Sequence, residues 1–199
     1  MGLRETASAG KLMRVIAGEY RRRVLRSLPG LEIRPTSDRL RETLFNVLCT
    51  GNPTALAGSF WIDLYAGTGA VGIEALSRGA RIAHFVEASK AAAAVIAANL
   101  KSLGISSGFQ IVKAEAAKSM RQLEAGCVAD YVFLDPPYSM QDEYAKTLTA
   151  LSESKLLNEH CIVIAEHQKR FDPGEAFGKL ERYRKLVQGD AALSFYRMV

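Results

Sequence analysis

Short apolar runs alternate with helical segments from about residue 51 to the end of the chain. Runs rich in β-branched and aromatic residues predict strands, which we place at 59–65, 82–86, 109–112, 131–134 and 161–165. Helices are predicted between them, at 70–77, 88–103, 116–123 and 142–151. Two further runs, 183–187 and 193–198, predict a closing antiparallel hairpin. This alternation indicates an α/β fold with a mostly parallel sheet of seven strands.

The first 50 residues follow a different pattern. Residues 1–12 are small and polar without periodicity, and we expect them to form a disordered extension. Alternation in 14–18 and 21–25, on either side of a corner, predicts a β-hairpin with a basic face. We therefore expect three parts: the extension, a basic N-terminal element at 13–50 and an α/β domain at 51–199.

Composition narrows the class of protein. With 199 residues, 48% of them hydrophobic, the chain is large enough to bury a core. It has no run of about 18 apolar residues and a polar start, so we expect a cytoplasmic protein without a membrane span. Cys49, Cys127 and Cys161 are far apart, which argues against a disulfide framework and a zinc site, and we expect no metal.

Positive charge is concentrated near the N-terminus. The formal net charge is +5, and every cation between Met13 and Arg41 is an arginine: Arg14, Arg21, Arg22, Arg23, Arg26, Arg34, Arg39 and Arg41. The last two lie near the start of a predicted helix that Thr36 or Ser37 caps. Because the arginine fork suits phosphate, the cluster favours nucleic-acid contact over its alternative, a solvated charged face.

A glycine fingerprint, Gly67-x-Gly69-x-x-Gly72, joins the first predicted strand to a helix. Two ligands compete for such a loop. A dinucleotide would place its pyrophosphate on the helix and its ribose on an acidic residue about 20 positions on, which Glu87 supplies. S-adenosylmethionine would instead use Asp63 for its cationic end, Glu87 for its ribose and Glu115 for its adenine. The glycines alone do not separate the two.

The strand at 131–134 ends on Asp135-Pro136-Pro137-Tyr138. Two prolines stiffen this loop and remove two backbone donors, and the carboxyl ends of parallel strands are where α/β sheets bind ligands. A ring that carries an amino group would stack on Tyr138, while Asp135 and a proline carbonyl accept its N–H bonds. The loop is also typical of an ordinary strand-ending turn. Together with Asp63, it favours a methyl donor over a dinucleotide.

These motifs form a recognisable set. The run from Asp63 to Gly69, Glu87 and the Asp-Pro-Pro-Tyr loop resemble a class I S-adenosylmethionine-dependent methyltransferase. The segment from Arg34 to Asn46, which begins Arg-Pro-Thr-Ser-Asp-Arg, is similar to the RsmD family, bacterial enzymes that methylate N2 of a guanine in 16S ribosomal RNA. The resemblance covers Met13 to Val199. One departure is the basic corner, where the family usually has a glycine and this chain has arginines.

The resemblance implies a Rossmann-like sheet of seven strands, S-adenosylmethionine as donor and S-adenosylhomocysteine as product. The implied substrate is 16S rRNA or an assembling 30S subunit, and we expect a monomer. For the donor site we expect Asp63, Tyr65, Ala66, Gly67, Thr68, Gly69, Glu87 and Glu115. For the chemistry we expect Asp135, Pro136, Pro137 and Tyr138. For RNA contact we expect Arg21, Arg22, Arg23, Arg34, Thr36, Arg39 and Arg41.

Other functions remain open at this point. Amino-directed methyltransferases of DNA adenine or cytosine, of tRNA guanine N2 and of protein glutamine use related loops, commonly with Asn in place of Asp135. The basic segment disfavours a protein target. A pyrimidine C5 methyltransferase needs a cysteine in its active loop, and no cysteine lies in one here. From other classes, an NAD(P)-binding oxidoreductase and a non-catalytic RNA-binding domain stay as alternatives.

Overall fold

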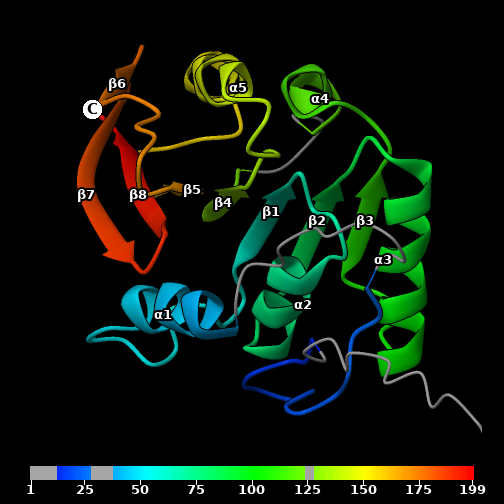
Figure 1. Ribbon diagram of the computed structural model, residues 1–199. Helices are drawn as coiled ribbons and strands as arrows, with labels where there is room; N and C mark the ends of the chain where they lie inside the picture. The colour runs from blue at the N-terminus through cyan, green and yellow to red at the C-terminus, as the bar shows by residue number, and fades with distance from the viewer. Residues whose placement is uncertain (1–12, 28–37, 124–127) are drawn as a thin grey trace, which may run out of the picture.

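The computed structural model describes residues 13–27, 38–123 and 128–199. These residues contain an eight-stranded sheet in the order β3-β2-β1-β4-β5-β8-β7-β6 (Figure 1). The strands are β1 (Phe60–Leu64), β2 (Ile82–Val86), β3 (Phe109–Val112), β4 (Tyr131–Leu134), β5 (Ile162–Gln168), β6 (Ala176–Phe177), β7 (Leu180–Gln188) and β8 (Ala191–Met198). The first five pair in parallel and the last three antiparallel.

Helices cover both faces of this sheet. On one face lie α1 (Asp38–Leu48), α2 (Ala70–Ser77) and α3 (Lys90–Leu103), and on the other α4 (Ala116–Leu123) and α5 (Asp142–Glu153) (Figure 1). Local interactions set both ends of α3. The Ser89 hydroxyl accepts from the Ala92 N–H at the start of α3, and Gly104 ends that helix with φ +78°. None of the described helices has the length and apolarity needed to span a bilayer.

The strand order reverses at β1. Strand β1 pairs with β2 on one side and with β4 on the other, so that Leu64 is in register with both Val86 and Leu134. All five residues of β1 and all four of β4 are buried. The carboxyl ends of β1, β2 and β4 therefore lie next to one another, which is the place where α/β sheets hold their ligands.

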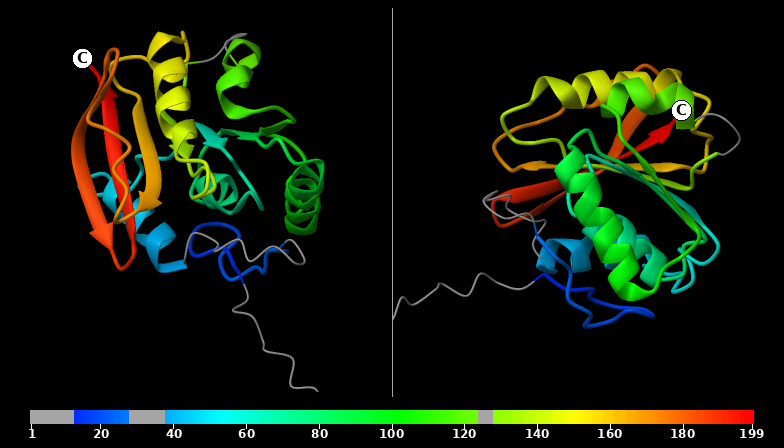
Figure 2. Two further views of the ribbon diagram at one scale, coloured as in Figure 1. Left: turned by 45° about the horizontal axis from the view of Figure 1, so that its top comes forward. Right: turned by 90° about the vertical axis from the view of Figure 1, so that its right-hand side faces the viewer.

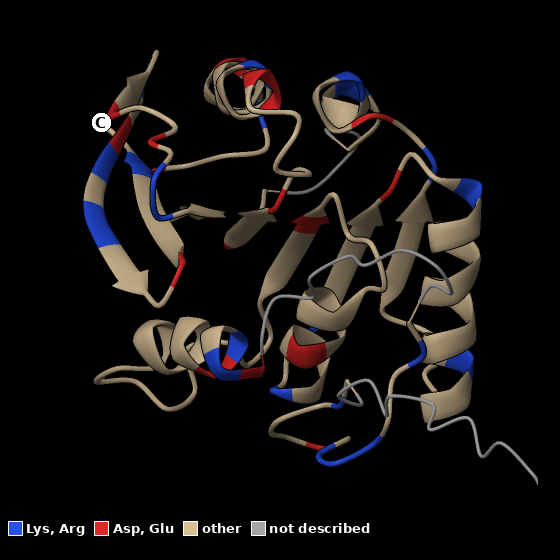
Figure 3. Ribbon diagram, in the orientation of Figure 1, with Lys and Arg blue, Asp and Glu red and all other residues tan. Residues whose placement is uncertain are grey.

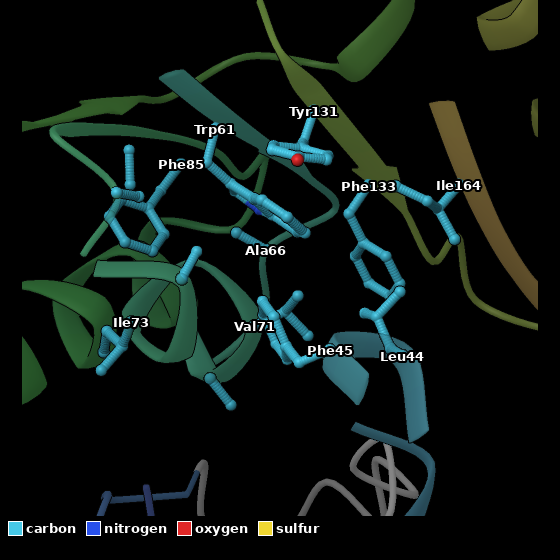
Figure 4. Close-up of a cluster of buried hydrophobic side chains, with 14 of the residues drawn as sticks. Leu44, Phe45, Trp61, Ala66, Val71, Ile73, Phe85, Tyr131, Phe133 and Ile164 are labelled. Carbon is cyan, nitrogen blue, oxygen red and sulfur yellow. The ribbon is translucent and has the colours of Figure 1, made fainter. Parts of the chain in front are cut away.

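Aromatic stacking fixes α1 against the sheet (Figure 4). The rings of Phe45 and Trp61 stack at 5.3 Å between centroids, and Trp61 stacks on Tyr131 at 5.4 Å. Leu44 and Phe45 are fully buried in this cluster. Because each large aromatic residue buries about 150–250 Å², this stack is a main attachment of α1 to the strands.

The N-terminal segment, residues 13–27, folds onto α2 and α3 (Figure 2). Its antiparallel pairing is short: Val15 donates to the Arg23 carbonyl and Leu25 to the Met13 carbonyl, each at 2.9 Å. Met13, Val15 and Leu25 are buried in the same cluster as the residues of α1. The segment is therefore packed into the core by its apolar side chains while its arginines stay outside.

Polar side chains of α2 bind the backbone of this segment. The fully buried Glu74 carboxylate accepts from the N–H groups of Ile16 at 2.8 Å and Ala17 at 3.0 Å, and pairs with Arg78 at 2.8 Å. The Ser77 hydroxyl accepts from the Tyr20 N–H at 3.0 Å. These bonds satisfy backbone groups that the short hairpin leaves without ladder partners.

The predicted fold is confirmed, with eight strands instead of seven. Strand β6 has only two residues, too short for an alternating pattern to reveal it. The N-terminal hairpin is confirmed as an irregular pairing that contains one isolated bridge, Arg14 to Val24. In its corner Arg22 takes φ +70°, a left-handed conformation that glycine adopts at lower cost than arginine. The extension 1–12 and the predicted caps Thr36 and Ser37 lie outside the described residues.

Gly18 packs closely against the C-terminal end of α2. A Cβ at this position would lie 1.8 Å from the Ser77 carbonyl oxygen, and φ is +81°. We predict that Gly18→Ala lowers the free energy of unfolding by about 2 kcal/mol or more, through overpacking and left-handed strain. Chemical denaturation measures this, with Gly51→Ala as control, because Gly51 has a similar φ of +79° and nothing within 4 Å. Equal losses of unfolding free energy in the two variants would show that close packing at Gly18 is not the cause.

Candidate active site

A cavity of about 720 Å³ opens where β1, β2 and β4 end. This volume lies within the range of small-molecule sites. The four residues of the Asp-Pro-Pro-Tyr loop and seven of the eight predicted donor residues line it: Asp63, Tyr65, Ala66, Gly67, Thr68, Glu87 and Glu115. Gly69, the buried residue that precedes α2, does not line the cavity. Acidic segments lie where the central strands end (Figure 3).

Glu87 organises the loop that follows β1. One carboxylate oxygen accepts from the Gly67 N–H at 2.9 Å and the other from the Ser89 N–H at 2.7 Å. The side chain is partly buried, and each oxygen has a second lone pair. Glu87 therefore holds the loop in place and can still accept hydrogen bonds from a ligand.

Asp63 is a buried carboxylate at the wall of the cavity. It is 2% exposed, and one oxygen accepts from the Gly72 N–H at 2.8 Å. Burial raises the pKa of Asp63 to about 8, the Gly72 bond lowers it in part, and the charge of Glu87 raises it further. Since removal from water disfavours the charged form, a cation beside Asp63 would favour its ionisation.

Gly72, the third glycine of the fingerprint, has both a steric role and a hydrogen-bonding role. A Cβ on Gly72 would lie 2.4 Å from the Phe85 ring, so the third glycine of the fingerprint permits α2 to pack closely on β2. The same residue donates its N–H to Asp63. Close packing and the fixed position of the carboxylate therefore depend on one small residue.

The loop after β4 has a rigid shape. The Pro137 carbonyl accepts from the Met140 N–H at 2.7 Å, which closes a turn and leaves the Pro136 carbonyl as the proline oxygen for a ligand. Asp135 and Tyr138 are partly buried and face the same cavity as Gly67.

Tyr65, which follows β1, also lines the cavity and takes φ +60°. Its hydroxyl lies 2.7 Å from the Thr147 hydroxyl and donates to Glu143 at 3.2 Å. This strained backbone is fixed by side-chain bonds to α5.

The N-terminal segment supplies one wall of the cavity through Met13 and Ser27. Asn99 on α3 connects this wall to the glycine loop. Its amide oxygen accepts from the Arg26 N–H at 2.8 Å, while its amide nitrogen donates to the Thr68 carbonyl at 2.9 Å and the Arg26 carbonyl at 3.2 Å. Thr68 also donates its hydroxyl to the Met13 sulfur at 3.7 Å. The basic segment and the glycine loop thus share one buried side chain.

The predicted RNA residues separate into three groups. Arg21, Arg22, Arg23 and Arg39 are exposed, and Arg23 also donates to the Ser102 carbonyl at 2.7 Å. Arg34 and Thr36 lie outside the described residues. Arg41 requires a correction: it is 0% exposed and donates to the Asp38 carboxylate at 2.9 Å and the Arg14 carbonyl at 2.5 Å. Its guanidinium points into the protein, where it joins α1 to the N-terminal segment.

Sequence reasoning missed Met13 and Ser27 as parts of the cavity wall and gave Asn99 little weight. The signal for Asn99 is a polar residue on the apolar face of an alanine-rich helix, where a buried amide needs partners. The partners themselves lie 31 and 73 positions away in the chain. No pattern in the sequence predicts these partners.

Proteins of similar sequence identify the family of this chain. The family model described as "Conserved hypothetical protein 95" matches residues 13–197. The chain belongs to this family. It is 34% identical to YlbH of Bacillus subtilis over 188 residues, which are 93% of this chain and 98% of that one. It is 33% identical to "Ribosomal RNA small subunit methyltransferase D" of Haemophilus influenzae, with 83% of each chain covered. The RsmD resemblance is confirmed.

The fold comparison agrees with the sequence comparison. The solved structure of yhhF from Escherichia coli superposes with a TM-score of 0.78 at 27% identity, covering 94% of this chain and 98% of that one. The fold is that of class I methyltransferases. Among the described residues, no group of three or more His, Cys, Asp or Glu could hold a metal ion.

The bridge made by Asn99 leads to a stability prediction. Asn99→Ala should lower the free energy of unfolding by about 2 kcal/mol, because partly buried backbone groups of Arg26 and Thr68 lose their partners. Hydrogen exchange of the Arg26 amide should quicken in parallel. Asn46→Ala, at an exposed position of α1, is the control and should be nearly neutral. An unchanged Arg26 exchange rate in the Asn99 variant would contradict the bridge.

Proposed function

We propose that this protein transfers a methyl group from S-adenosylmethionine to the exocyclic N2 of a guanine in 16S ribosomal RNA. One observation carries the proposal: the Asp-Pro-Pro-Tyr loop and the glycine loop line a single cavity. The relatives named ribosomal RNA small subunit methyltransferase D support the rRNA target. We further propose that residues 13–50 contact RNA and that residues 51–199 carry the chemistry.

The donor fits the charges around the cavity. Asp63 is a buried carboxylate with a raised pKa, so a sulfonium or ammonium group nearby would stabilise its ionised form. Glu87 would accept from a ribose diol, and the exposed Glu115 from an adenine amino group. A pyrophosphate beside Asp63 would disfavour the ionised form and gain no charge partner there, which argues against a dinucleotide.

The acceptor geometry follows from the loop after β4. A guanine that has left its stack would lie on Tyr138, which offsets part of the few kcal/mol that unstacking costs. Asp135 and the Pro136 carbonyl would accept the N–H bonds of the exocyclic amine. When bound, S-adenosylmethionine supplies the electrophilic methyl group. Asp135 would stabilise the positive charge that develops on the amine nitrogen and accept the proton that this nitrogen loses as S-adenosylhomocysteine leaves, and the rigid prolines keep its position fixed.

Two alternatives are separable by experiment. An amino-directed methyltransferase for DNA or tRNA would use the same loop, and only the identity of the methylated nucleoside distinguishes it. An NAD(P)-dependent oxidoreductase would bind NADH. Calorimetry should detect binding of S-adenosylhomocysteine and none of NADH.

Transfer of tritiated methyl groups tests the proposal as a whole. Small ribosomal subunits from a strain that lacks this protein should accept label, and nucleoside mass spectrometry should identify N2-methylguanosine. Label in DNA or tRNA, with none in the subunits, would show that the target is DNA or tRNA and not 16S rRNA. Absence of label in every nucleic acid, with S-adenosylhomocysteine still bound, would refute an RNA methyltransferase.

Variants of the catalytic loop test the assigned roles. Asp135→Ala and Tyr138→Ala should each lower methyl transfer at least about 100-fold, because one removes the charge that stabilises the transition state and the other the stacking surface. Binding of S-adenosylhomocysteine should be retained. Tyr138→Phe keeps the aromatic face and should keep most of the activity. Unchanged turnover in both alanine variants would remove the loop from the mechanism.

The raised pKa of Asp63 predicts a pH dependence of donor binding. Below about pH 8 the carboxyl group of the free protein is protonated, and an ion pair with the ammonium group of the ligand requires it to ionise. Affinity for S-adenosylhomocysteine should therefore rise more than about tenfold from pH 6 to pH 8, because linkage allows up to a factor of ten per unit. Asp63→Asn should bind weakly with a flat profile. The same rise of affinity with pH in the Asn variant would show that Asp63 is not the group responsible for it.

A further inference from the structure

Strand β7 has a bulge that changes which side chains share a face. Its register against β8 runs from Arg182 opposite Tyr196 directly to Arg184 opposite Phe195, so Tyr183 is the extra residue. A bulge of this kind puts two consecutive side chains on one face of the sheet. Tyr183 and Arg184 therefore both lie on the face that α1 covers, where Phe195 is buried.

The rings and guanidinium groups of this face are in contact. The Arg197 guanidinium lies over the Tyr183 ring at 5.4 Å, and that of Arg184 over the Phe195 ring at 5.9 Å. Tyr183 packs against Phe195 with 6.3 Å between centroids. Phe195 is 0% exposed, whereas Tyr183 is 45% exposed. An accessible tyrosine ring thus stands on a buried phenylalanine, with an arginine beside each ring.

The opposite face of the same strand differs. Arg182 pairs with Asp172 at 2.6 Å and with Glu175 at 3.2 Å, and Lys185 pairs with Asp172 at 2.9 Å. Among the described residues, Arg184 and Arg197 make no ion pair within 4 Å, although Glu181 is in register with Arg197. The cations on the α1 side are therefore held by aromatic rings and keep their charge available for an anion.

This surface is connected to the basic N-terminal segment by α1. The start of the helix touches that segment through Asp38, which lies 3.8 Å from Arg14. Its apolar side packs in one cluster with Phe195. Helix α1 lies between the segment and the β7–β8 hairpin (Figures 1 and 2). Its 11 residues span about 16 Å, a distance that a few nucleotides cover.

We propose that Tyr183, Arg184 and Arg197 form a second RNA-contact surface, which binds single-stranded nucleotides that flank the target guanine. This inference rests on the proposed function. An unpaired base would stack on the exposed part of the Tyr183 ring, as bases do on aromatic residues in proteins that bind single strands. Arg184 and Arg197 would contact the adjoining phosphates. A polyanion suits this surface because two cations without acidic partners flank the ring.

Binding of a fluorescein-labelled, 12-nucleotide single-stranded RNA of mixed sequence tests the surface. Tyr183→Ala should weaken binding about tenfold through lost stacking, whereas Tyr183→Phe should stay within twofold. The double variant Arg184→Gln, Arg197→Gln should weaken binding and reduce the slope of log affinity against log salt by about 1.4, at about 0.7 per phosphate contact. Arg121→Gln, an exposed arginine on α4 at the other face, is the matched control and should change nothing.

Two further measurements keep the result interpretable. Melting temperature and binding of S-adenosylhomocysteine should be the same in all variants. Unchanged RNA affinity in both Tyr183→Ala and the double variant would overturn the surface, even where wild-type protein methylates rRNA. Loss of methylation only on assembled subunits, with normal binding of naked RNA, would indicate a protein contact instead and also overturn it. If wild-type protein methylates no RNA, the proposed function fails separately, and the RNA titration still reports on the surface.

Discussion

The parallel pairing of β1 with β4 is the constraint on which the site depends. It places Leu64 and Leu134 in register, so that the glycine loop and the Asp-Pro-Pro-Tyr loop begin one residue later on neighbouring strands. The two loops are about 70 positions apart in the sequence, and only the reversal of strand order at β1 brings them to one cavity. Every chemical role that we propose assumes this adjacency.

Buried polar groups then fix the loops relative to the sheet. Glu74 and Asn99 are fully buried, and each binds backbone of the N-terminal segment, with Glu74 also paired to Arg78. Asp63 is also buried, and burial raises its pKa to about 8, because its bond from one backbone N–H lowers the pKa only in part. Buried polar groups whose hydrogen bonds are all made within the protein stabilise the fold. A buried carboxylate with only one hydrogen bond can instead bind a cationic group of a ligand.

Much of this architecture is predictable from the sequence, because buried parallel strands are continuous apolar runs and the glycine fingerprint has a fixed context. The limits of prediction also have physical causes. Strand β6 is too short to show a period. The burial of Arg41 and the bridge through Asn99 depend on contacts between distant parts of the chain. Local spacing indicates which face of a helix is covered, but it does not say which distant segment supplies the partners of a polar side chain there.

A crystal structure with S-adenosylhomocysteine is the most direct test of the account. We predict that the ligand occupies the cavity, with its ribose at Glu87, its amino group near Asp63 and its sulfur facing Asp135 and Tyr138. A ligand bound elsewhere, or a sulfur atom that points away from the loop after β4, would contradict the shared cavity as the place of methyl transfer.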